Sequence, residues 1–421
     1  MILFVLAWKS LKNRLFTSIL TLLSIALSVG LLMGVERVRI GAHESFSNTI
    51  SQTDLIVGAK GGSVQLLLYS VFRIGNATNN IDSKTYAHFK THPAVKWTIP
   101  YSLGDSHQGF RVVGTDENFY EHFRYHGDRS LHFSNGKAPE ELFDVVLGAE
   151  VARQLGYVLG SKVILTHGVT DGVGIINHSD KPFTVTGILE KTNTPVDRSV
   201  YICLEGMEAI HIDWQDGAAP MKGHEIPAAS LKKQNIPVKQ ITSFLLRTQN
   251  RIETLSLQRE INNYTDEPLM AIIPGVALNE LWNAVSYAET SLRVVSIFVV
   301  LVGFIGMLIA LYTSLNERRR EMAILRAIGA GPSKIFALLI LESGLLGIAG
   351  ALAGVGLILA LLQASQSLLE TEFGLRLPLS MPSTLEISYL ACVVLGAFLI
   401  GFIPALKAYK NSLSDGLVVR S

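Results

Sequence analysis

Four long windows of this 421-residue sequence contain almost no charged side chains. They are residues 15–35, 294–316, 335–369 and 387–406, and Glu342 is the only charged residue within them. A bilayer core of ~30 Å needs about 20 apolar residues in a helix, so each window is long enough to cross a membrane. Because 48% of all residues are hydrophobic and only 17% are charged, we predict a membrane protein with four transmembrane helices.

Basic residues are concentrated in three short segments that flank these windows. Residues 1–14, 317–334 and 407–421 hold 11 of the 36 Lys and Arg residues, whereas the loop 370–386 holds only Arg376. Short loops rich in Lys and Arg remain in the cytoplasm, so we predict that both termini and the segment 317–334 are cytoplasmic. The first apolar run is too long for a signal-peptide core, and we expect it to remain as an anchor. The net charge of +1 argues against a nucleic-acid partner.

The 258 residues from 36 to 293 are long enough to form a domain of their own outside the membrane. Runs rich in β-forming residues and one helical pattern predict a mixed α/β fold with two subdomains. The expected strands are 54–59, 110–115, 162–168, 183–190, 198–204, 241–248 and 269–275, and the expected helix is 251–263. The last strand, helix and strand resemble one half of a ferredoxin-like layer. Residues 216–230 are expected to form a loop, and Cys203 and Cys392 do not suggest a disulfide.

The predicted fold is therefore four transmembrane helices plus a large mixed α/β extracytoplasmic domain inserted between helices 1 and 2, with a helical stalk. The segments in chain order are a cytoplasmic N-terminus (1–14), transmembrane helix 1 (15–35), the α/β domain (36–275), the stalk (276–293), transmembrane helix 2 (294–316), a cytoplasmic coupling loop (317–334), transmembrane helix 3 (335–362), an extracytoplasmic loop (363–386), transmembrane helix 4 (387–406) and a cytoplasmic C-terminus (407–421).

Apolar residues recur at coiled-coil spacing just before the second window. They are Leu278, Leu281, Val285, Ala288 and Leu292, spaced by 3, 4, 3 and 4 positions. No Pro or Gly interrupts the chain from 276 until Gly303, so one helix over 276–316 would be ~60 Å long. We interpret 276–293 as a rigid stalk that transmits displacement. The alternative is a helix that merely adjoins a transmembrane span.

The segment 317–331 joins the second and third windows and is both basic and amphipathic. Met322, Leu325 and Ile328 share one helical face. Gly329 is placed to end this helix, and Pro332 suits the first turn of the next one. A basic loop touching anionic lipid would explain the charge alone. The ordered apolar face favours a short helix that docks into a groove on a cytoplasmic partner.

The stretch "RREMAILRAIGAGPSKIFALLILESGLLGIAGALAG" (319–354) resembles the signature of FtsX-like permeases, the four-span subunits of type VII ABC transporters. This superfamily includes MacB, LolC, LolE and FtsX. The matching positions are Arg319, Glu321, Ile324, Leu325, Arg326, Ala327, Ile328, Gly329, Ile335, Glu342, Ser343, Gly347, Gly350 and Gly354. Met322 and Ala323 replace the commoner Ile-Gly. Residues 145–165 also resemble a recurring segment of the family's exterior domains.

This resemblance implies that the chain pairs with a second permease copy, either itself or a close paralogue, and that each copy docks on a cytoplasmic ABC ATPase dimer. That partner would bind ATP and Mg, and its closure would move the stalk and the exterior domain. The coupling residues implied are Arg319, Arg320, Glu321, Met322, Leu325, Arg326, Ile328 and Gly329. The expected location is the bacterial cytoplasmic (inner) membrane.

Two functions follow from the resemblance. As a transporter, the complex would expel or extract an amphiphilic cargo such as a peptide, lipid, lipoprotein or hydrophobic drug. As a signalling subunit of the FtsX type, it would activate a cell-wall hydrolase without transport. A periplasmic adaptor, carrier or hydrolase activator is a further candidate partner, beside membrane lipids. The chain holds no G-x-x-x-x-G-K-[ST] motif, because "GYVLGSK" (156–162) has the wrong spacing, so we expect no enzyme activity from it alone.

The third window carries small residues and one acid. Gly350 and Gly354 form a GxxxG pair, with Gly347 one turn upstream, and this spacing favours close helix contact. Enrichment of Gly in membrane helices is the alternative explanation. A carboxylate in hydrocarbon is costly unless it is paired, so we expect Glu342 to pair with cytoplasmic-side basic residues or a neighbouring span.

Two weaker patterns lie in the α/β domain. His122 and His126 stand at i, i+4, with His132 nearby, which is a metal-ligand spacing. They lack helical context and a carboxylate, so we predict no metal site. The apolar run from Val64 to Phe72 is too short to span a bilayer. It is expected either to lie on the membrane surface or over a substrate path, or to form a buried helix of the domain.

Overall fold

In the computed structural model, the chain forms two compact units. The membrane unit comprises Met1–Ala42, Ser286–Ser367 and Leu377–Ser421, and the α/β domain comprises His43–Val285 with Leu368–Arg376. The residues that the structure describes are 2–47, 49–168, 178–214, 226–232, 234–317, 319–373 and 382–414.

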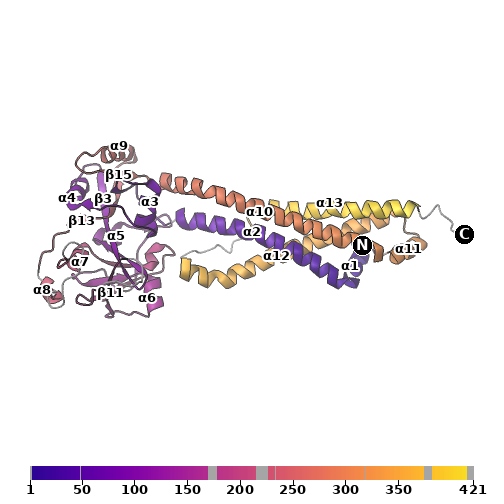
Figure 1. Cartoon of the computed structure of the whole chain (residues 1–421), viewed down its shortest axis with the longest axis horizontal. Helices are drawn as coiled ribbons and strands as arrows, with labels where there is room; N and C mark the ends of the chain where they lie inside the picture. Colours follow the sequence, from indigo (N-terminus) through magenta and orange to yellow (C-terminus); the bar gives the residue numbers. More distant parts are fainter. Residues whose placement is uncertain are drawn as a thin grey trace. The chain divides into compact units, whose positions relative to one another are not determined.

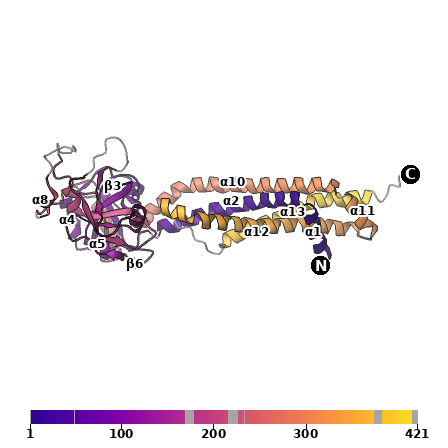
Figure 2. The ribbon, with the colours of Figure 1, turned by 90° about the horizontal axis from the view of Figure 1, so that it is seen from below.

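Among the described residues, four helices are long and apolar enough to cross a bilayer, and within the membrane unit they run side by side (Figures 1 and 2). They are α2 (Leu15–Ser47), α10 (Pro274–Glu317), α12 (Pro332–Phe373) and α13 (Thr384–Ser414). A helix satisfies all of its backbone polar groups internally, which lipid requires. The predicted architecture, four transmembrane helices with a large α/β domain between the first and second, is confirmed.

The helices extend beyond the charge-poor windows. α2 continues to Ser47, past the expected end at 35, and α12 continues to Phe373, past the expected end at 362. The residues added to α12, QASQSLLETEF, include Ala, Leu, Glu and Gln, which are good helix formers. Charge counting detects the apolar part of a helix but not its ends. A short helix, α1 (Ile2–Asn13), precedes α2.

Glycines bring α12 close to its neighbours in the bundle. The α-carbons of Gly350 and Gly354 face α2, where added β-carbons would lie 2.7 Å from Ile25 Cβ and from Ala26 O, respectively. Gly347 faces Ala397 of α13 in the same way. Buried apolar residues of all four helices surround these contacts: Ile25, Val29, Met33, Met307, Leu311, Leu346, Ala351, Val393 and Ala397.

Buried ionisable residues join α2, α10 and α13. Arg37 Nε donates to Glu386 Oε1 at 2.9 Å, and these side chains are only 4% and 3% exposed. Glu36 accepts from Arg39 Nη2 at 2.6 Å and lies 3.5 Å from Arg293 Nη2. We call these five residues the charge network.

Glu386 also caps the N-terminus of α13. Its Oε2 accepts from the backbone N–H of Ser383 at 2.7 Å, while Ser383 Oγ accepts from the backbone N–H of Glu386 at 3.3 Å. This reciprocal pair is a capping box. One carboxylate therefore both caps α13 and ties it to α2.

The α/β domain is built on one 11-stranded sheet with the order β15-β1-β14-β3-β4-β12-β8-β11-β7, while β10 pairs with β3 and β9 with β11. The strands are β1 (Leu55–Ala59), β3 (Val95–His107), β4 (Phe110–Thr115), β7 (Phe133–Gly136), β8 (Asp144–Leu147), β9 (Lys162–Val163), β10 (Thr166–His167), β11 (Phe183–Leu189), β12 (Ser199–Cys203), β14 (Ser243–Thr248) and β15 (Leu269–Ile272). Two further pairs are β2 (Ile81–Asp82) with β13 (Gln240–Ile241), and β5 (Arg124–Tyr125) with β6 (Arg129–Ser130).

Short helices cover the sheet (Figure 1). They are α3 (Ser63–Leu67), the π-helix η1 (Leu68–Phe72), α4 (Ser83–Lys90), α5 (Glu117–His122), α6 (Ala149–Leu155), the 3-10 helix η2 (Pro195–Arg198), α7 (Leu204–Ala209), α8 (Ala228–Leu231) and α9 (Arg251–Asn262).

Alternating residues of the strands form separate cores on the two faces of the sheet. On one face, Ile56, Val113 and Tyr201 belong to a cluster that runs across the whole sheet. On the other face, the neighbouring residues divide into two clusters, one over β1, β14 and β15 with α4 and α9, the other over β4, β8, β11 and β12 with α6 and α7. Successive side chains of a strand point to opposite faces, which produces this division.

The long strand β3 links the two halves. Residues Val95–Tyr101 pair with β14, and residues from Ser102 onward pair with β4. Sequence analysis missed this strand because Pro100 and Gly104 interrupt its β-forming residues. At the edge of the first half, β14, α9 and β15 form the expected strand–helix–strand unit, with β1 antiparallel to and between the two strands.

Three local expectations have different outcomes. The segment 162–168 is not one strand but two short ones, β9 and β10. Of the two alternatives for the run from Val64 to Phe72, the buried helix of the domain is confirmed and the exposed membrane-surface segment is not, because Leu66, Leu67 and Phe72 are buried in the domain core. Most of the expected loop 216–230 lies outside the described residues, and its end forms α8.

The contact between α2 and α12 can be tested at Gly354. Gly354→Val should destabilise the protein by about 1–3 kcal/mol, because overpacking forces closely packed helices apart. Gly356→Val is the matched control on the same helix, since no atom lies within 4 Å of a β-carbon built there. Thermal unfolding of the detergent-purified chain would measure both, and equal midpoints for the two variants would contradict the contact.

The charge network predicts a strong coupling between Arg37 and Glu386. Glu386→Gln should cost about 3–5 kcal/mol, because it leaves a buried guanidinium without its counter-charge. A double-mutant cycle with Arg37→Gln, followed by unfolding in detergent, tests the pair. The double variant should lose much less stability than the sum of the single variants, and strict additivity would show that the two side chains do not interact.

Candidate functional site

The segment between the second and third transmembrane helices forms the short helix α11 (Arg319–Ala327). Its C-terminus carries two backbone hydrogen bonds, from Gly329 N–H to Arg326 O at 3.0 Å and from Ala330 N–H to Leu325 O at 2.9 Å. This is a Schellman motif, and Gly329 has the positive φ of 93° that the motif requires. Pro332 then begins α12. The side chains of Arg319 and Arg320 lie outside the described part of the structure.

The apolar residues of α11 face two ways. Met322 packs against a bundle cluster that includes Leu315, Ile335 and Ala405, whereas Ile324 is 56% exposed and Ile328 is 76% exposed. Leu325 and Arg326 are half-buried and Glu321 is exposed. The expected face of Met322, Leu325 and Ile328 is therefore divided: Met322 anchors the helix, and the i, i+4 pair Ile324 and Ile328 is presented outward.

A mainly apolar pocket of about 330 Å³ is lined by Ile328, one member of this exposed pair. Leu3 and Leu6 of α1 form one wall, Leu325 and Ile328 of α11 another, and α12 contributes Lys334, Ile335 and Leu338. Sequence reasoning placed α1 only as a cytoplasmic terminus and did not connect it with α11. The two segments are about 320 positions apart, and only folding brings them together.

Glu342 is buried on α12, where it is only 2% exposed. It lines a small pocket of about 30 Å³ together with Arg14 and Ser314. Arg14 Nη1 donates to the backbone carbonyl of Ser314 at 2.9 Å. The acid of the third transmembrane helix thus lies in a polar pocket that includes a basic residue from the start of α2.

The five residues of the expected stalk seam lie within the continuous helix α10. Leu278 and Leu281 are half-buried, whereas Val285 is 37% exposed, Leu292 is 54% exposed and Ala288 is also exposed. In this single chain the seam is covered only at its N-terminal part.

The histidines considered from sequence do not form a ligand pair. α5 ends at His122, whose ring stacks on Trp97 with a centroid distance of 5.5 Å. His126 lies beyond that end at a φ of 45°, so the two do not share a helix face. Helical spacing was therefore a misleading signal here.

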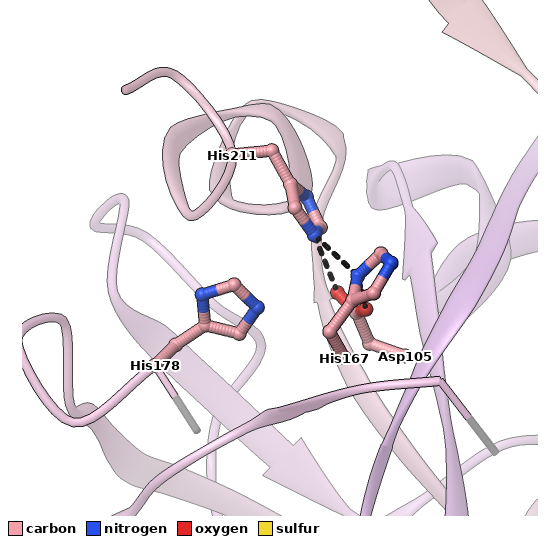
Figure 3. A group of neighbouring side chains, drawn as sticks. All are labelled: Asp105, His167, His178 and His211. Carbon is pink, nitrogen blue, oxygen red and sulfur yellow. Dashed lines mark hydrogen bonds and ion pairs between the residues drawn. The ribbon is translucent and has the colours of Figure 1, made fainter. Parts of the chain in front are cut away.

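Four other side chains of the α/β domain converge instead, as Figure 3 shows. Asp105, His167, His178 and His211 each offer one ligand atom, and these atoms all lie within 4.8 Å of one another. Burial lowers the pKa of His178 to about 4, so its ring is neutral at pH 7. A hydrogen bond to Asp105 raises the pKa of His167. The sequence contains no local motif for this group, because Asp105 and His167 are 62 positions apart and His211 follows a further 44 positions on.

Two family models match the chain. The model of the MacB-like periplasmic core domain matches residues 18–261, which is more than half of the chain, and the model of the FtsX-like permease C-terminal region matches residues 293–413. The second range contains α11 and the three transmembrane helices around it.

Three curated relatives extend the comparison. The lipoprotein-releasing system transmembrane protein LolC of Xylella fastidiosa is 23% identical over 96% of this chain and 94% of its own length. The pyoverdine export ATP-binding/permease protein PvdT of Pseudomonas syringae is 26% identical over 76% of this chain and 45% of its own length. The macrolide export ATP-binding/permease protein MacB of Neisseria meningitidis is 32% identical over 56% of this chain and 34% of its own length.

The chain thus spans less than half the length of the two export proteins and nearly all of LolC. Its four transmembrane helices, its α/β domain between the first two, and both family matches agree. The chain belongs to the FtsX-like and MacB-like permeases, the membrane subunits of type VII ABC transporters.

Proposed function

We propose that this chain is the permease subunit of an ATP-driven transporter that works by mechanotransmission. A separate cytoplasmic ATPase dimer, which binds ATP and Mg, docks on α11 and moves the α/β domain through α10. The observation that carries this proposal is the exposed pair Ile324 and Ile328, of which Ile328 also lines the apolar pocket of α1, α11 and α12. Both lie in the short connection between two transmembrane helices.

The energetics of α11 favour a protein partner. Burying an exposed isoleucine side chain is worth about 1.5–3 kcal/mol, so two on one face can contribute a substantial part of a docking interface. The helix is itself held in place by Met322 and by the Schellman motif. A preorganised helix loses little conformational entropy on binding, which strengthens docking.

The continuous helix α10 is the proposed transmission element. Its 44 residues correspond to ~66 Å at 1.5 Å per residue, and a helix of this kind is stiff along its axis. Val285, Ala288 and Leu292 present exposed apolar surface on it. In the proposed complex a second permease copy covers this seam.

The cargo that we propose is an amphiphilic molecule: a peptide, lipid, lipoprotein or hydrophobic drug. The names of the relatives refer to lipoprotein release and to export, which supports extraction or expulsion rather than uptake. The second candidate is a non-transporting subunit that activates a cell-wall hydrolase. Identifying bound lipid or peptide in the purified complex would favour transport, and ATP-dependent hydrolase activation without cargo would favour signalling.

Ile328→Glu should reduce co-purification of the ATPase at least about tenfold, because a loss of 1.4 kcal/mol already corresponds to that factor. Arg326→Glu should act in the same direction by reversing a basic charge on the same helix. Capture of the ATPase by the tagged permease from detergent extracts would measure both.

The matched control for this test is Ile252→Glu, which makes the same substitution at a residue that is 91% exposed on α9 of the α/β domain. It should leave co-purification unchanged. If Ile328→Glu also left it unchanged while binding to anionic vesicles fell, α11 would be a lipid contact and the docking proposal would be lost.

The proposed orientation places both termini and α11 in the cytoplasm of a bacterial inner membrane. In a variant without Cys203 and Cys392, a cysteine replacing Leu325 should react with a membrane-impermeant thiol reagent only after the inner membrane is permeabilised. A cysteine replacing Ile252 should react as soon as the reagent reaches the periplasm. The reverse pattern of labelling would invert the orientation.

A further inference from the structure

The cluster of Asp105, His167, His178 and His211, which we call the histidine cluster, is assembled from three parts of the α/β domain. Asp105 and His167 are direct partners in the pairing of β3 with β10, so their side chains lie on the same face. The backbone N–H of His178 donates to the backbone carbonyl of Leu165 at 2.9 Å, which places His178 beside β10. His211 lies just beyond the end of α7. Figure 3 shows their rings and carboxylate directed toward one another.

Three distances among Asp105, His167 and His211 are close to those of a tetrahedral metal site. Four ligands bound at 2.0–2.1 Å to Zn²⁺ lie about 3.4 Å from one another. The observed separations are 3.1 Å from His167 Nδ1 to Asp105 Oδ1, 3.0 Å from His167 Nδ1 to His211 Nε2, and 3.6 Å from His211 Nε2 to Asp105 Oδ2. The ring of His178 completes the set within 4.8 Å.

Surrounding groups orient the ligands. His211 Nδ1 lies 3.0 Å from the backbone carbonyl of Met207. A carbonyl can only accept, so Nδ1 carries the proton and, in the neutral ring, Nε2 presents a lone pair to the cluster. Metal-bound histidines usually have such a partner on the second nitrogen.

A buried lysine fixes the two loops that carry His178 and His211. Lys181 is 1% exposed, and its Nζ lies 2.6 Å from Asp180 and 2.8 Å from Asp213. The ring of Trp214 packs against the three histidine rings with centroid distances of 4.7 to 5.2 Å. The ion pairs of Lys181 and the ring contacts of Trp214 therefore help to position the ligands, in addition to the hydrogen bonds among the ligands themselves.

Two polar atoms of the cluster are otherwise unused. Asp105 Oδ2 and His178 Nε2 are buried and have no hydrogen-bond partner among the described residues. Buried polar groups in folded proteins almost always have a partner. A hydrogen-bonded cluster alone would leave both unsatisfied, whereas a cation placed among the four side chains would use them.

We propose that the histidine cluster is a binding site for a divalent transition-metal ion of the Zn²⁺ class. Three imidazoles and one carboxylate suit Zn²⁺, and the absence of thiolate or thioether among them disfavours Cu(I). The protein supplies all four ligands, so no coordination position is left open for a hydrolytic water, and the site binds rather than catalyses. The His167 side chain is 47% exposed, which gives the ion a route from solvent.

The test is metal titration of the full-length chain in detergent after removal of metal with a chelator. Competition between the protein and a chromophoric zinc indicator should show one Zn²⁺ bound per chain. Replacement by Co²⁺ should give the intense visible absorption of a tetrahedral cobalt site. Zn²⁺ should also raise the thermal unfolding midpoint.

Variants separate the histidine cluster from other histidines. His178→Gln and Asp105→Asn should each weaken Zn²⁺ binding at least about tenfold and abolish the rise in unfolding midpoint. His122→Gln is the control, because it removes one partly exposed histidine outside the cluster. Size-exclusion elution and circular dichroism would establish that each variant is folded.

Failure of the wild-type chain to bind Zn²⁺, or equal binding by all three variants, would overturn the proposal. Weakened binding in His122→Gln comparable to that in His178→Gln would do the same. These outcomes do not depend on ATPase docking, so the metal site and the proposed permease function stand or fall separately.

Discussion

The close approach of α12 to both α2 and α13 is the contact on which the membrane unit depends. Between helices in lipid there is little hydrophobic driving force, so association relies on packing that small residues permit. Gly350 and Gly354 let α12 approach α2, and Gly347 lets it approach α13. Since α11 leads directly into α12 at Pro332, a force applied to α11 in the proposed mechanism acts first on the helix that contacts two others.

The charge network gives the same bundle a second, directional constraint. Arg37 and Glu386 tie α2 to α13, while Glu36 and Arg293 bring α10 to α2. α2 and α10 lead into the α/β domain, and the C-terminal end of α12 also belongs to that unit. A buried ion pair is weak evidence for stability, but removing one partner leaves an uncompensated buried charge. Glu36 is 3% exposed and lies 3.5 Å from Arg293, which is 43% exposed. We propose that this pair links α2 to α10 and that the motion reaches the domain through both helices.

How much the sequence predicts depends on the range of the interaction. Four transmembrane helices follow from composition within windows of about 20 residues, and the end of α11 follows from Gly329 and Pro332. The exposed pair Ile324 and Ile328 does not follow, because periodicity identifies an apolar face but not which part the bundle covers. β3 is obscured by Pro100 and Gly104. The histidine cluster is assembled by strand register and loop packing, which leave no local motif.

The environment of Asp105 shows why the histidine cluster requires a chemical explanation. Its side chain is fully buried on a central strand, and among the described residues the cationic candidates within 4.0 Å of it are histidines. Burying a carboxylate costs several kcal/mol even after relaxation, and the hydrogen bond to His167 satisfies only one of its oxygens. A divalent cation neutralises the carboxylate, uses the lone pairs of all three rings and accounts for their geometry together.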